Sequence, residues 1–456
     1  MATDAATIDT QASPPEAAHS DNEPKIKVSC EQLIVGRCLD HPLYDGNGVL
    51  LLAQGALITS ELRKNLKSRN ISEVEVSKSD AVKLSLTTDQ LAELFTRQGA
   101  FSFDTETTTK LDTIIDSGLM AVKNDGPALK ESVVFHGRKA YSAEKRESLL
   151  LQHQSASESL DTMIKGVLKG GRVDGAGIAV MTANFLSGLT SDTDSLMSVA
   201  FEARSDAALA DDSLKTSMYG MAIALEMGLD AENIRKIGLI GIVQNWGMVR
   251  VPKAIRYCER SLTDKEFLEI KRHPIYTLEM LEKISGFSAV VPLVAYQMHE
   301  QINGRGYPRG RSGKSIHQYA RILQVADAYV AMTSPRPYRQ PLMPYVAMSS
   351  LLGYTKIRKF DPEVVRAFLL TMALFPIGSV VVLEDSRVAV VYRRNGNNYN
   401  QPIVKILQNP DGTLADPNDP AAIVDLAEAG IQVVQALPTP GRNELTADTR
   451  PAPTCT

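Results

Sequence analysis

Cysteine is scarce in this chain of 456 residues, which has only Cys30, Cys38, Cys258 and Cys455. These positions show neither the Cys-x-x-Cys spacing of a metal or redox motif nor the density of a disulfide framework. A reducing, cytoplasmic setting is therefore the default expectation.

Long apolar runs and basic blocks are also missing. No stretch approaches the ~18 uninterrupted apolar residues of a membrane-spanning helix. The acidic, proline-containing N-terminus is unlike a secretory signal. The formal net charge of -4 is spread along the chain, which does not favour binding along a nucleic-acid backbone. We therefore expect no membrane span and no nucleic-acid partner, whereas a few arginines can still bind a small anion.

Hydrophobic periodicity predicts a mainly α protein that is α+β overall, with a helical domain between small mixed or β modules. In SLKTSMYGMAIALEMGL, Leu214, Met218, Met221 and Leu225 recur at steps of four and three. Short β-rich runs around DGNG and an Asn-Gly turn predict the flanking modules. We expect a disordered tail over 1–25, an α/β module over 26–80, a helical linker region over 81–205, a helical domain over 206–370, a β module over 371–436 and a disordered tail over 437–456.

Two segments carry the functional signal. MHEQINGRGYPRG at 298–310 and RILQVADAYVAMTSPRPYR at 321–339 closely resemble the two signature segments of HD-GYP domains. VQNWGMVRVP and IKRHP fall in the order in which that family has its other motifs. The resemblance implies a helical phosphohydrolase that opens cyclic di-GMP with two or three metal ions, held by histidines and carboxylates around a bridging hydroxide.

Most metal positions of that family are replaced in this chain. The family has a histidine where Asp212 stands, a His-Asp pair at Gln244 and Asn245, a catalytic lysine at Met248, and the first of two adjacent histidines at Met298. His273, His299 and Asp327 are retained. A neutral amide cannot supply the bridging charge of the lost aspartate, and a thioether suits only soft metals. The resemblance therefore implies a member without the family's catalysis.

The retained groups leave two readings open. His273, His299 and Asp327, with Asp212, suffice in number for one zinc, iron or manganese ion. Alternatively they are polar residues bonded to one another in a shrunken cavity, with no cofactor.

The candidate ligand-binding residues are Arg336, Arg339 and Tyr307. The two arginines stand where the family contacts phosphates, and guanidinium groups can grip phosphate oxygens bidentately without a metal. The alternative is that they are solvated charges.

The loop formed by Gly304, Arg305, Gly306, Tyr307 and Pro308 is a candidate interaction site. The resemblance implies contact with diguanylate cyclase domains, and the alternative is a structural crossover between helices. Trp246, the chain's single tryptophan, is expected to fill core rather than to stack on a guanine base.

These observations rank three functions. The first is a catalytically inactive HD-GYP protein of bacterial cyclic di-GMP signalling, acting as a nucleotide receptor or as an adaptor for signalling proteins. The second is a residual metal-dependent phosphodiesterase acting on cyclic di-GMP or another phosphodiester. The third is an oligomerisation platform, and on this reading the chain forms a homo-oligomer. The role of residues 85–200 is not predicted.

Overall fold

The computed structural model describes residues 25–30, 33, 39, 41–54, 56, 58, 60–77, 80, 105–118, 122–204, 208–259, 262–336, 339–416 and 419–446. The chain divides into two compact units, one formed by residues 1–33 and 39–86 and the other by residues 34–38 and 87–456. Each unit has a buried core of its own.

The first unit is a four-stranded antiparallel sheet with a helix, and its strands run in the order β1-β4-β2-β3. Its elements are β1 Lys25–Ser29, β2 Leu43–Asp45, β3 Leu50–Leu52, α1 Ser60–Ser68 and β4 Glu73–Ser77. In the DGNG turn between β2 and β3, the Asp45 carboxylate accepts the backbone N–H groups of Asn47 and Val49. Val74 and Val76 of β4 share the core with Leu66 of α1.

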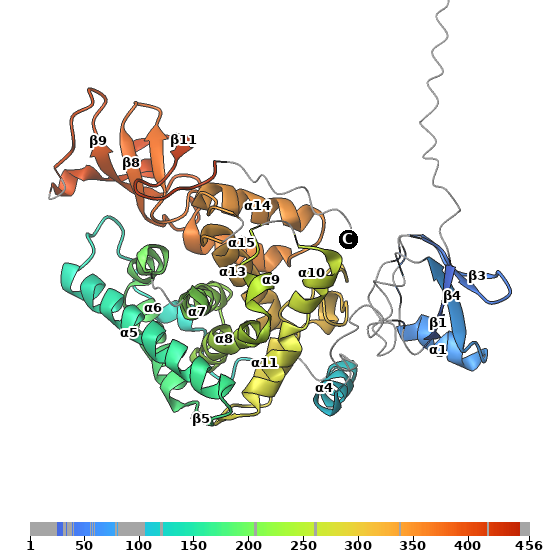
Figure 1. Ribbon diagram of the computed structural model, residues 1–456. Helices are drawn as coiled ribbons and strands as arrows, with labels where there is room; N and C mark the ends of the chain where they lie inside the picture. The colour runs from blue at the N-terminus through green and yellow to red at the C-terminus, as the bar shows by residue number, and fades with distance from the viewer. Residues whose placement is uncertain are drawn as a thin grey trace, which may run out of the picture. The chain divides into compact units, whose positions relative to one another are not determined.

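The second unit is mainly helical (Figure 1). Its longer helices are α4 Glu106–Asp116, α5 Ala143–Leu168, α6 Ala176–Glu202, α7 Ala208–Glu226, α8 Ala231–Val243, α11 His273–Leu281, α13 Gln318–Thr333, α14 Pro344–Lys356 and α15 Pro362–Met372. The shorter elements are η2 Leu129–Ser132, η3 Trp246–Arg250, α9 Lys253–Arg256, α10 Asp264–Ile270, α12 Val290–Tyr296 and η4 Gly313–Ser315. Two short strands, β5 Val173–Asp174 and β6 Ile284–Ser285, pair in parallel.

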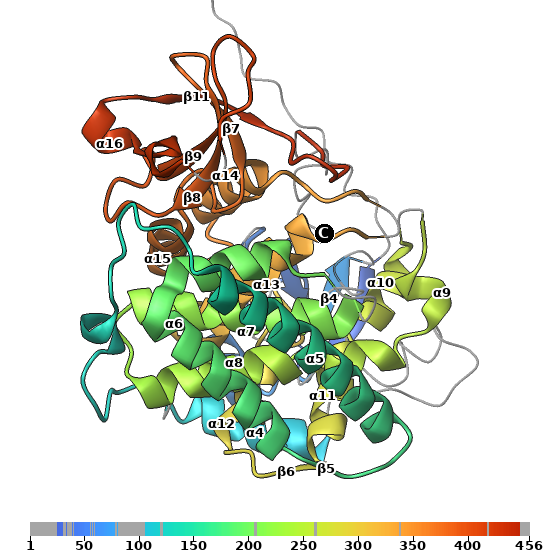
Figure 2. The ribbon, with the colours of Figure 1, turned by 90° about the vertical axis from the view of Figure 1, so that its left-hand side faces the viewer.

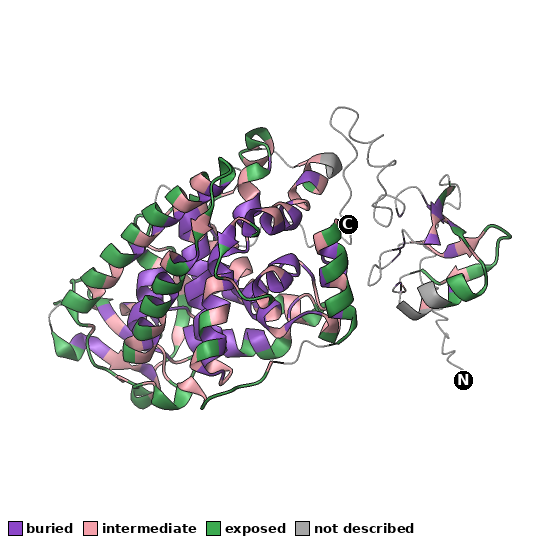
Figure 3. Ribbon diagram, turned by 90° about the horizontal axis from the view of Figure 1, so that it is seen from below, coloured by how far each residue is buried: buried purple, intermediate pink, exposed green. Residues whose placement is uncertain are grey.

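Helix α7 is the central helix of this unit and packs against α5, α6, α8, α13 and α15. Leu214, Met218, Met221 and Leu225, which follow the helical period, are at most 2% exposed. The other faces of α7 are buried as well, as expected for a helix surrounded by helices. In Figure 3 buried residues gather in the interior of the helical unit and exposed residues on its outer faces. This packing brings α7, the end of α8 and α13 together around the candidate site.

A five-stranded antiparallel sheet follows α15, with the strand order β10-β9-β8-β7-β11. Its elements are β7 Val380–Leu383, β8 Val388–Arg393, β9 Ile403–Gln408, η5 Pro420–Ala422, β10 Ile423–Asp425, α16 Leu426–Ala429 and β11 Val433–Leu437. The sheet lies at one end of the helices, near α14 and α15 (Figures 1 and 2).

A buried ion pair joins this sheet to α6. Arg393 at the end of β8 is 1% exposed and donates to both carboxylate oxygens of Asp192, at 2.8 and 2.9 Å. Asp192 has non-helical backbone angles and marks a kink within α6. The Tyr141 hydroxyl donates to the carbonyl of Tyr392, and the two rings are 4.2 Å apart.

The expected fold class is confirmed, because the described chain is mainly helical with small sheets on the N- and C-terminal sides. Of the segments expected to be tails, residues 1–24 and 447–456 lie outside the described residues. Residues 437–446 are described, and Leu445 forms a parallel bridge with Leu342. None of the helices in the described part of the chain combines the length and hydropathy that a membrane crossing needs.

Candidate functional site

The stretch VQNWGM runs from the end of α8 into η3 and packs closely on α11. The Gly247 N–H donates to the Thr277 hydroxyl at 2.9 Å. A Cβ atom on Gly247 would lie only 2.1 Å from the His273 carbonyl oxygen, so this contact requires glycine. The close approach fixes the two amide residues before Gly247 against the helix that carries His273.

The side chains of these two amide residues bind Asp327, which lies on α13. Gln244 Nε2 and Asn245 Nδ2 donate to the same carboxylate oxygen, Asp327 Oδ1, at 3.0 and 2.9 Å. Burial raises the pKa of Asp327 to about 6, against the lowering effect of the Gln244 hydrogen bond. Burial disfavours the charged form of this carboxyl group, and the amide N–H groups of Gln244 and Asn245 stabilise that form.

His273 and His299 bind each other. Their Nε2 atoms are 2.8 Å apart, and His273 Nδ1 lies 2.7 Å from the carbonyl oxygen of Ile270. His273 therefore donates from Nδ1 and accepts at Nε2, while His299 Nε2 carries a hydrogen. Asn245 Oδ1 lies 3.3 Å from the same His299 nitrogen, so the amide oxygen is a second acceptor. The result is a continuous hydrogen-bonded chain from Ile270 through both imidazoles and Asn245 to Asp327.

Both imidazoles are neutral in this environment. Burial lowers the pKa of His273 to about 4 and holds the pKa of His299 well below its usual value, with a further contribution from His273. The Tyr307 ring stacks on His299 with centroids 4.9 Å apart and planes at 8°. Tyr307 thus covers the histidine pair, and burial raises the pKa of its hydroxyl well above the usual value.

Apolar side chains occupy two further positions of the expected site. Met298 is 1% exposed, whereas Met248 is half-buried. Trp246 is completely buried and its Nε1–H donates to the Ile242 carbonyl at 2.9 Å. The expectation that Trp246 fills core is confirmed, because its ring has no exposed face for a base to stack on.

Asp212 contacts a different set of residues from those that bind Asp327. The Ser334 hydroxyl donates to Asp212 Oδ1 at 2.7 Å, and an Arg336 guanidinium nitrogen lies 2.9 Å from Oδ2. Arg336 also contributes to the field at Asp327, where it lowers the pKa. Arg336 therefore stands between two carboxylates, one of which it binds directly.

Arg339 is committed to the end of a helix. Its guanidinium donates to the carbonyls of Ala331, Met332 and Gln340 at 2.7 to 3.1 Å, and its backbone bonds reciprocally with Arg336. Cations at a helix C-terminus satisfy carbonyl groups that lack intrahelical partners. In this arrangement the backbone of Arg339 holds Arg336 in place, and its two terminal guanidinium nitrogens donate to carbonyl groups.

The loop 304–308 is anchored from below. Gly306 packs so closely that a Cβ atom there would lie 2.3 Å from Glu300 Cα. The Glu300 carboxylate accepts the backbone N–H groups of Arg309 and Arg311, each at 2.7 Å. Arg305 is exposed at the tip, while Pro308 is buried behind it. The Glu300 side chain therefore holds the backbone on the C-terminal side of the loop in place.

Helix α4 neutralises the two arginines that follow the loop. Asp112 binds Arg309 Nε at 2.9 Å and Arg311 at 2.7 Å, and Asp116 binds Arg311 at 2.6 Å. The sequence places these groups almost 200 residues apart, and a solvated helix with two carboxylates one turn apart gives no signal for this partner. The charges of Arg309 and Arg311 are thus compensated by carboxylates of α4.

The residues present do not fit a metal centre of the implied kind. Gln244 and Asn245 point N–H groups, which carry partial positive charge, at the carboxylate that would face the cation. Two imidazoles bind each other instead of aiming their lone pairs at one point. Within the described residues, no three His, Cys, Asp or Glu side chains are grouped so that they could hold a metal ion.

Comparisons with known proteins identify several relatives of this chain. A family model described as HD domain matches residues 196–364. The cyclic di-GMP phosphodiesterase PA4108 of Pseudomonas aeruginosa is 30% identical over 293 residues, which cover 64% of this chain and 69% of that protein. The cyclic di-GMP phosphodiesterase response regulator RpfG of Xanthomonas campestris is 34% identical over 148 residues, or 32% of this chain and 39% of its own. Among solved structures, the HDG"Y"P protein Bd1817 of Bdellovibrio bacteriovorus aligns with 76% of this chain and 98% of its own at 14% identity and a TM-score of 0.39.

The chain therefore belongs to the HD domain family, among relatives named as cyclic di-GMP phosphodiesterases. The family membership expected from the two signature segments is confirmed. Membership of the family does not by itself assign the activity of its relatives to this chain, because activity depends on the residues at the site.

Proposed function

We propose that this chain is a non-catalytic member of its family that acts in bacterial cyclic di-GMP signalling, as a receptor for the nucleotide or as an adaptor for signalling proteins. One observation carries the proposal. The Asp327 carboxylate is held by two amide N–H groups where a metal-binding relative needs cations. Ionised oxygen and imidazole ligands are what divalent metals require, and an amide network leaves the attacking water without an activator.

The preserved scaffold supports a binding role. The loop 304–308 and the segment carrying Arg336 are held by specific contacts with Glu300, Arg339 and Asp212. Arg336 is partly exposed, at 30% of its side chain, so its guanidinium can meet a phosphate oxygen on its open side. For an adaptor, the exposed tip at Arg305 is the part of the loop that a partner reaches, because Arg309 and Arg311 are bound to α4.

Hydrolysis and binding measured on one preparation test the proposal. With cyclic di-GMP and Mn²⁺, Fe²⁺ or Zn²⁺, we expect no linear product above a protein-free blank and no stoichiometric metal after purification. We expect calorimetry to detect cyclic di-GMP binding that weakens in Arg336→Ala, or a pull-down to recover a partner that is lost in Arg305→Glu.

The opposite outcome is equally specific. Metal-dependent turnover that disappears in His299→Ala would establish the residual phosphohydrolase and refute the non-catalytic reading. Absence of turnover together with absence of nucleotide and partner binding would also defeat the proposal, because nothing would then remain for the receptor or the adaptor to do.

A further inference from the structure

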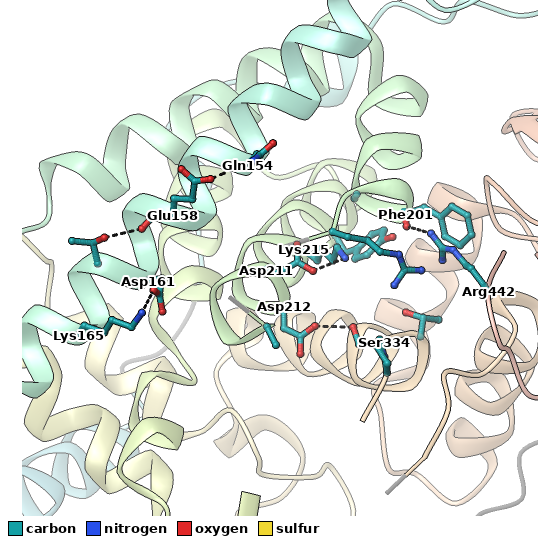
Figure 4. A pocket seen from close by; sticks show the side chains of 17 residues that line it. Gln154, Glu158, Asp161, Lys165, Phe201, Asp211, Asp212, Lys215, Ser334 and Arg442 are labelled. Atoms are coloured by element: carbon teal, nitrogen blue, oxygen red, sulfur yellow. Dashed lines mark hydrogen bonds and ion pairs between the residues drawn. The ribbon is translucent and has the colours of Figure 1, made fainter. Parts of the chain in front are cut away.

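The long helix α5 has three sides with different surroundings. One side is buried in the helical unit, where Leu160 and Ile164 are at most 3% exposed. A second side borders a polar cavity that Asp212, Ser334 and Arg442 also line (Figure 4). The third side faces outward, and Figure 2 shows α5 on the near side of the helical unit, in front of α7 and α8. This outer side belongs neither to the core nor to the site described above.

An open groove runs between the outer sides of α5 and α6. Its volume is about 760 Å³, and its apolar lining includes Leu151, Val180 and Met181. Leu151 is 61% exposed and Val180 is 59% exposed. Single exposed apolar residues are common on protein surfaces, but two that line the same groove favour a surface that a partner covers.

The end of the groove at the start of α5 is acidic. Among the described residues that line the groove, Glu144 and Glu147 carry the only charges, and neither has an ion pair within the described part of the chain. Two basic residues lie near them in the sequence. Arg146 is paired with Glu202, and the exposed Lys145 does not line the groove. This end therefore keeps a net negative charge.

The other end of α5 is basic on the same side of the helix. Lys169, the C-cap of α5, follows Glu144 by 25 positions. Because this spacing is about seven turns of an α-helix, the two side chains project from the same side. Lys169 and Arg172 are both exposed, and no ion pair is found for either of them among the residues that the structure describes.

The carboxylates at this basic end have partners of their own. Asp161 is paired with Lys165 on the cavity side of α5 (Figure 4). Asp174 accepts the backbone N–H of Ala176, at the start of α6, at 3.0 Å. With Lys169 and Arg172 counted against Asp174, this end keeps a net positive charge. The outer side of α5 is therefore negative at one end and positive at the other.

We propose that the outer side of α5 and the adjoining groove form a self-association surface, on which a second copy of the chain docks with its α5 antiparallel to the first. A two-fold axis midway between positions 144 and 169 places Glu144 of each copy opposite the partner's Lys169. The contact is then isologous, with the same ion pair formed twice. The small side chains of Ser155 and Ser159 near the axis allow the two helices to approach, and Leu151 of each copy is removed from water.

The size of this contact predicts a reversible dimer. Helix α5 has 26 residues and is therefore about 39 Å long. A strip of that length and of one helix diameter covers roughly 400–500 Å² on each copy, at the low end of specific interfaces. The inference goes beyond the proposed function, because it uses no residue of the amide and histidine network. It also assigns a role to part of the segment 85–200, for which the sequence predicted none.

Sedimentation equilibrium of the full chain, with the charge reversed at either end of α5, tests this surface. The wild type should show a monomer–dimer equilibrium at micromolar concentration. Glu144→Lys and Lys169→Glu should each raise the dissociation constant of the dimer about tenfold or more, because each brings two pairs of like charges together. An equimolar mixture of the two variants should regain the wild-type affinity, since both ion pairs form again in the mixed dimer.

The mixture also controls for changes within one copy. Both reversals oppose the dipole of α5, but mixing the variants leaves the fold of each copy as it was. Lys253→Glu, at an exposed lysine on α9 that does not line the groove, is the matched control and should dimerise like the wild type. Leu151→Asp should weaken the dimer and keep the melting temperature of the monomer, because Leu151 is exposed there.

Three results would each overturn the proposal. The first is a wild type that stays monomeric up to its solubility limit. The second is a pair of charge-reversed variants that dimerise like Lys253→Glu, which would place the dimer contact elsewhere. The third is a mixture of the two variants that associates no more tightly than either variant alone, which would exclude the antiparallel pairing of Glu144 with Lys169.

Discussion

At the scale of single residues, the amide at position 245 has two chemically distinct faces, and both are used. Its Nδ2 donates to Asp327 and its Oδ1 faces the hydrogen on His299 Nε2. A carboxylate of the same shape offers two acceptors and no donor. The hydrogen-bonded network is therefore complementary to Asn245 as an amide, and the metal-binding form of the site would need a different charge at the same place.

Asn245→Asp should destabilise the metal-free protein by about 2 kcal/mol, because it removes a donor to a buried carboxylate and places a second negative charge beside it. Denaturant unfolding in EDTA measures this loss, with Asn245→Leu as a control that removes the donor without adding charge. The charged variant should be the less stable at neutral pH. Equal stability of the two variants would show that charge at this position is unimportant.

The combined variant Gln244→His, Asn245→Asp and Met298→His restores the implied ligands together. We expect Mn²⁺ or Zn²⁺ to raise the melting temperature of this variant and not that of the wild type, since a ligand that binds only the folded state stabilises it. A metal-dependent shift of the wild type would show that the residues present do hold a metal ion.

How far the sequence predicted this site depends on the kind of contact. Motif positions identified Gln244, Asn245, His299 and Asp327, because the signature segments fix their place in the chain. The partners of Asp212 were not predictable, since they depend on how α7 meets the end of α13. Arg339 turns back onto the carbonyl groups at the end of α13, and the sequence did not indicate this role. Arg442 lies in a segment whose composition indicates a tail, and only packing reveals it as a cavity residue.

At the scale of elements, α13 carries Asp327 and begins at an unusual cap. His317 Nδ1 accepts the backbone N–H of Tyr319 at 3.1 Å, and the ring is 6% exposed. Burial lowers the pKa of His317 to about 4, assisted by Arg321. The cap works only in the neutral form, because a protonated imidazole has no acceptor.

His317→Asn should separate capping from titration, since asparagine is a good N-cap acceptor and has no charge to gain. In the wild type, the unfolded state binds more protons than the folded state between pH 6.5 and about 4. The stability that His317 contributes is therefore present above pH 6.5 and is lost as the pH falls through this window. The pKa difference corresponds to at most about 3 kcal/mol.

Urea unfolding of both proteins across pH 4 to 7.5 measures the effect. The free energy of unfolding of His317→Asn, relative to the wild type, should rise as the pH falls. The other buried histidines are present in both proteins and cancel in the difference. Parallel pH profiles would refute a titrating cap.

At the scale of the whole second unit, one buried arginine joins the C-terminal sheet to the helices. Arg393 binds Asp192 with two hydrogen bonds and lies 3.5 Å from Asp194. Burial raises the pKa of Asp194 to about 6 despite Arg394 and Arg393 nearby. The sequence predicted the sheet from its β-rich runs, but it could not indicate that a kink at Asp192 in α6 receives Arg393.

Arg393→Ala should cost about 3–5 kcal/mol of stability, because removing one partner of a buried pair leaves the other charge uncompensated. The loss should be larger at pH 7.5 than at pH 5. Without the arginine the folded-state pKa values of both aspartates rise, so the folded state binds more protons and stability falls as the pH increases. Thermal unfolding at the two pH values, with proteolysis of the β module as a second readout, measures this.

Arg387→Ala is the matched control, since Arg387 pairs with Asp385 at the surface, where both side chains are over a fifth exposed. Such exposed pairs contribute below about 1 kcal/mol. In Arg393→Ala combined with Asp192→Asn, part of the stability should return because one unpaired charge is gone. If Arg393→Ala is as stable as Arg387→Ala at pH 7.5, the sheet is held to the helices by apolar packing and the ring contact of Tyr141 with Tyr392, and the buried ion pair is dispensable.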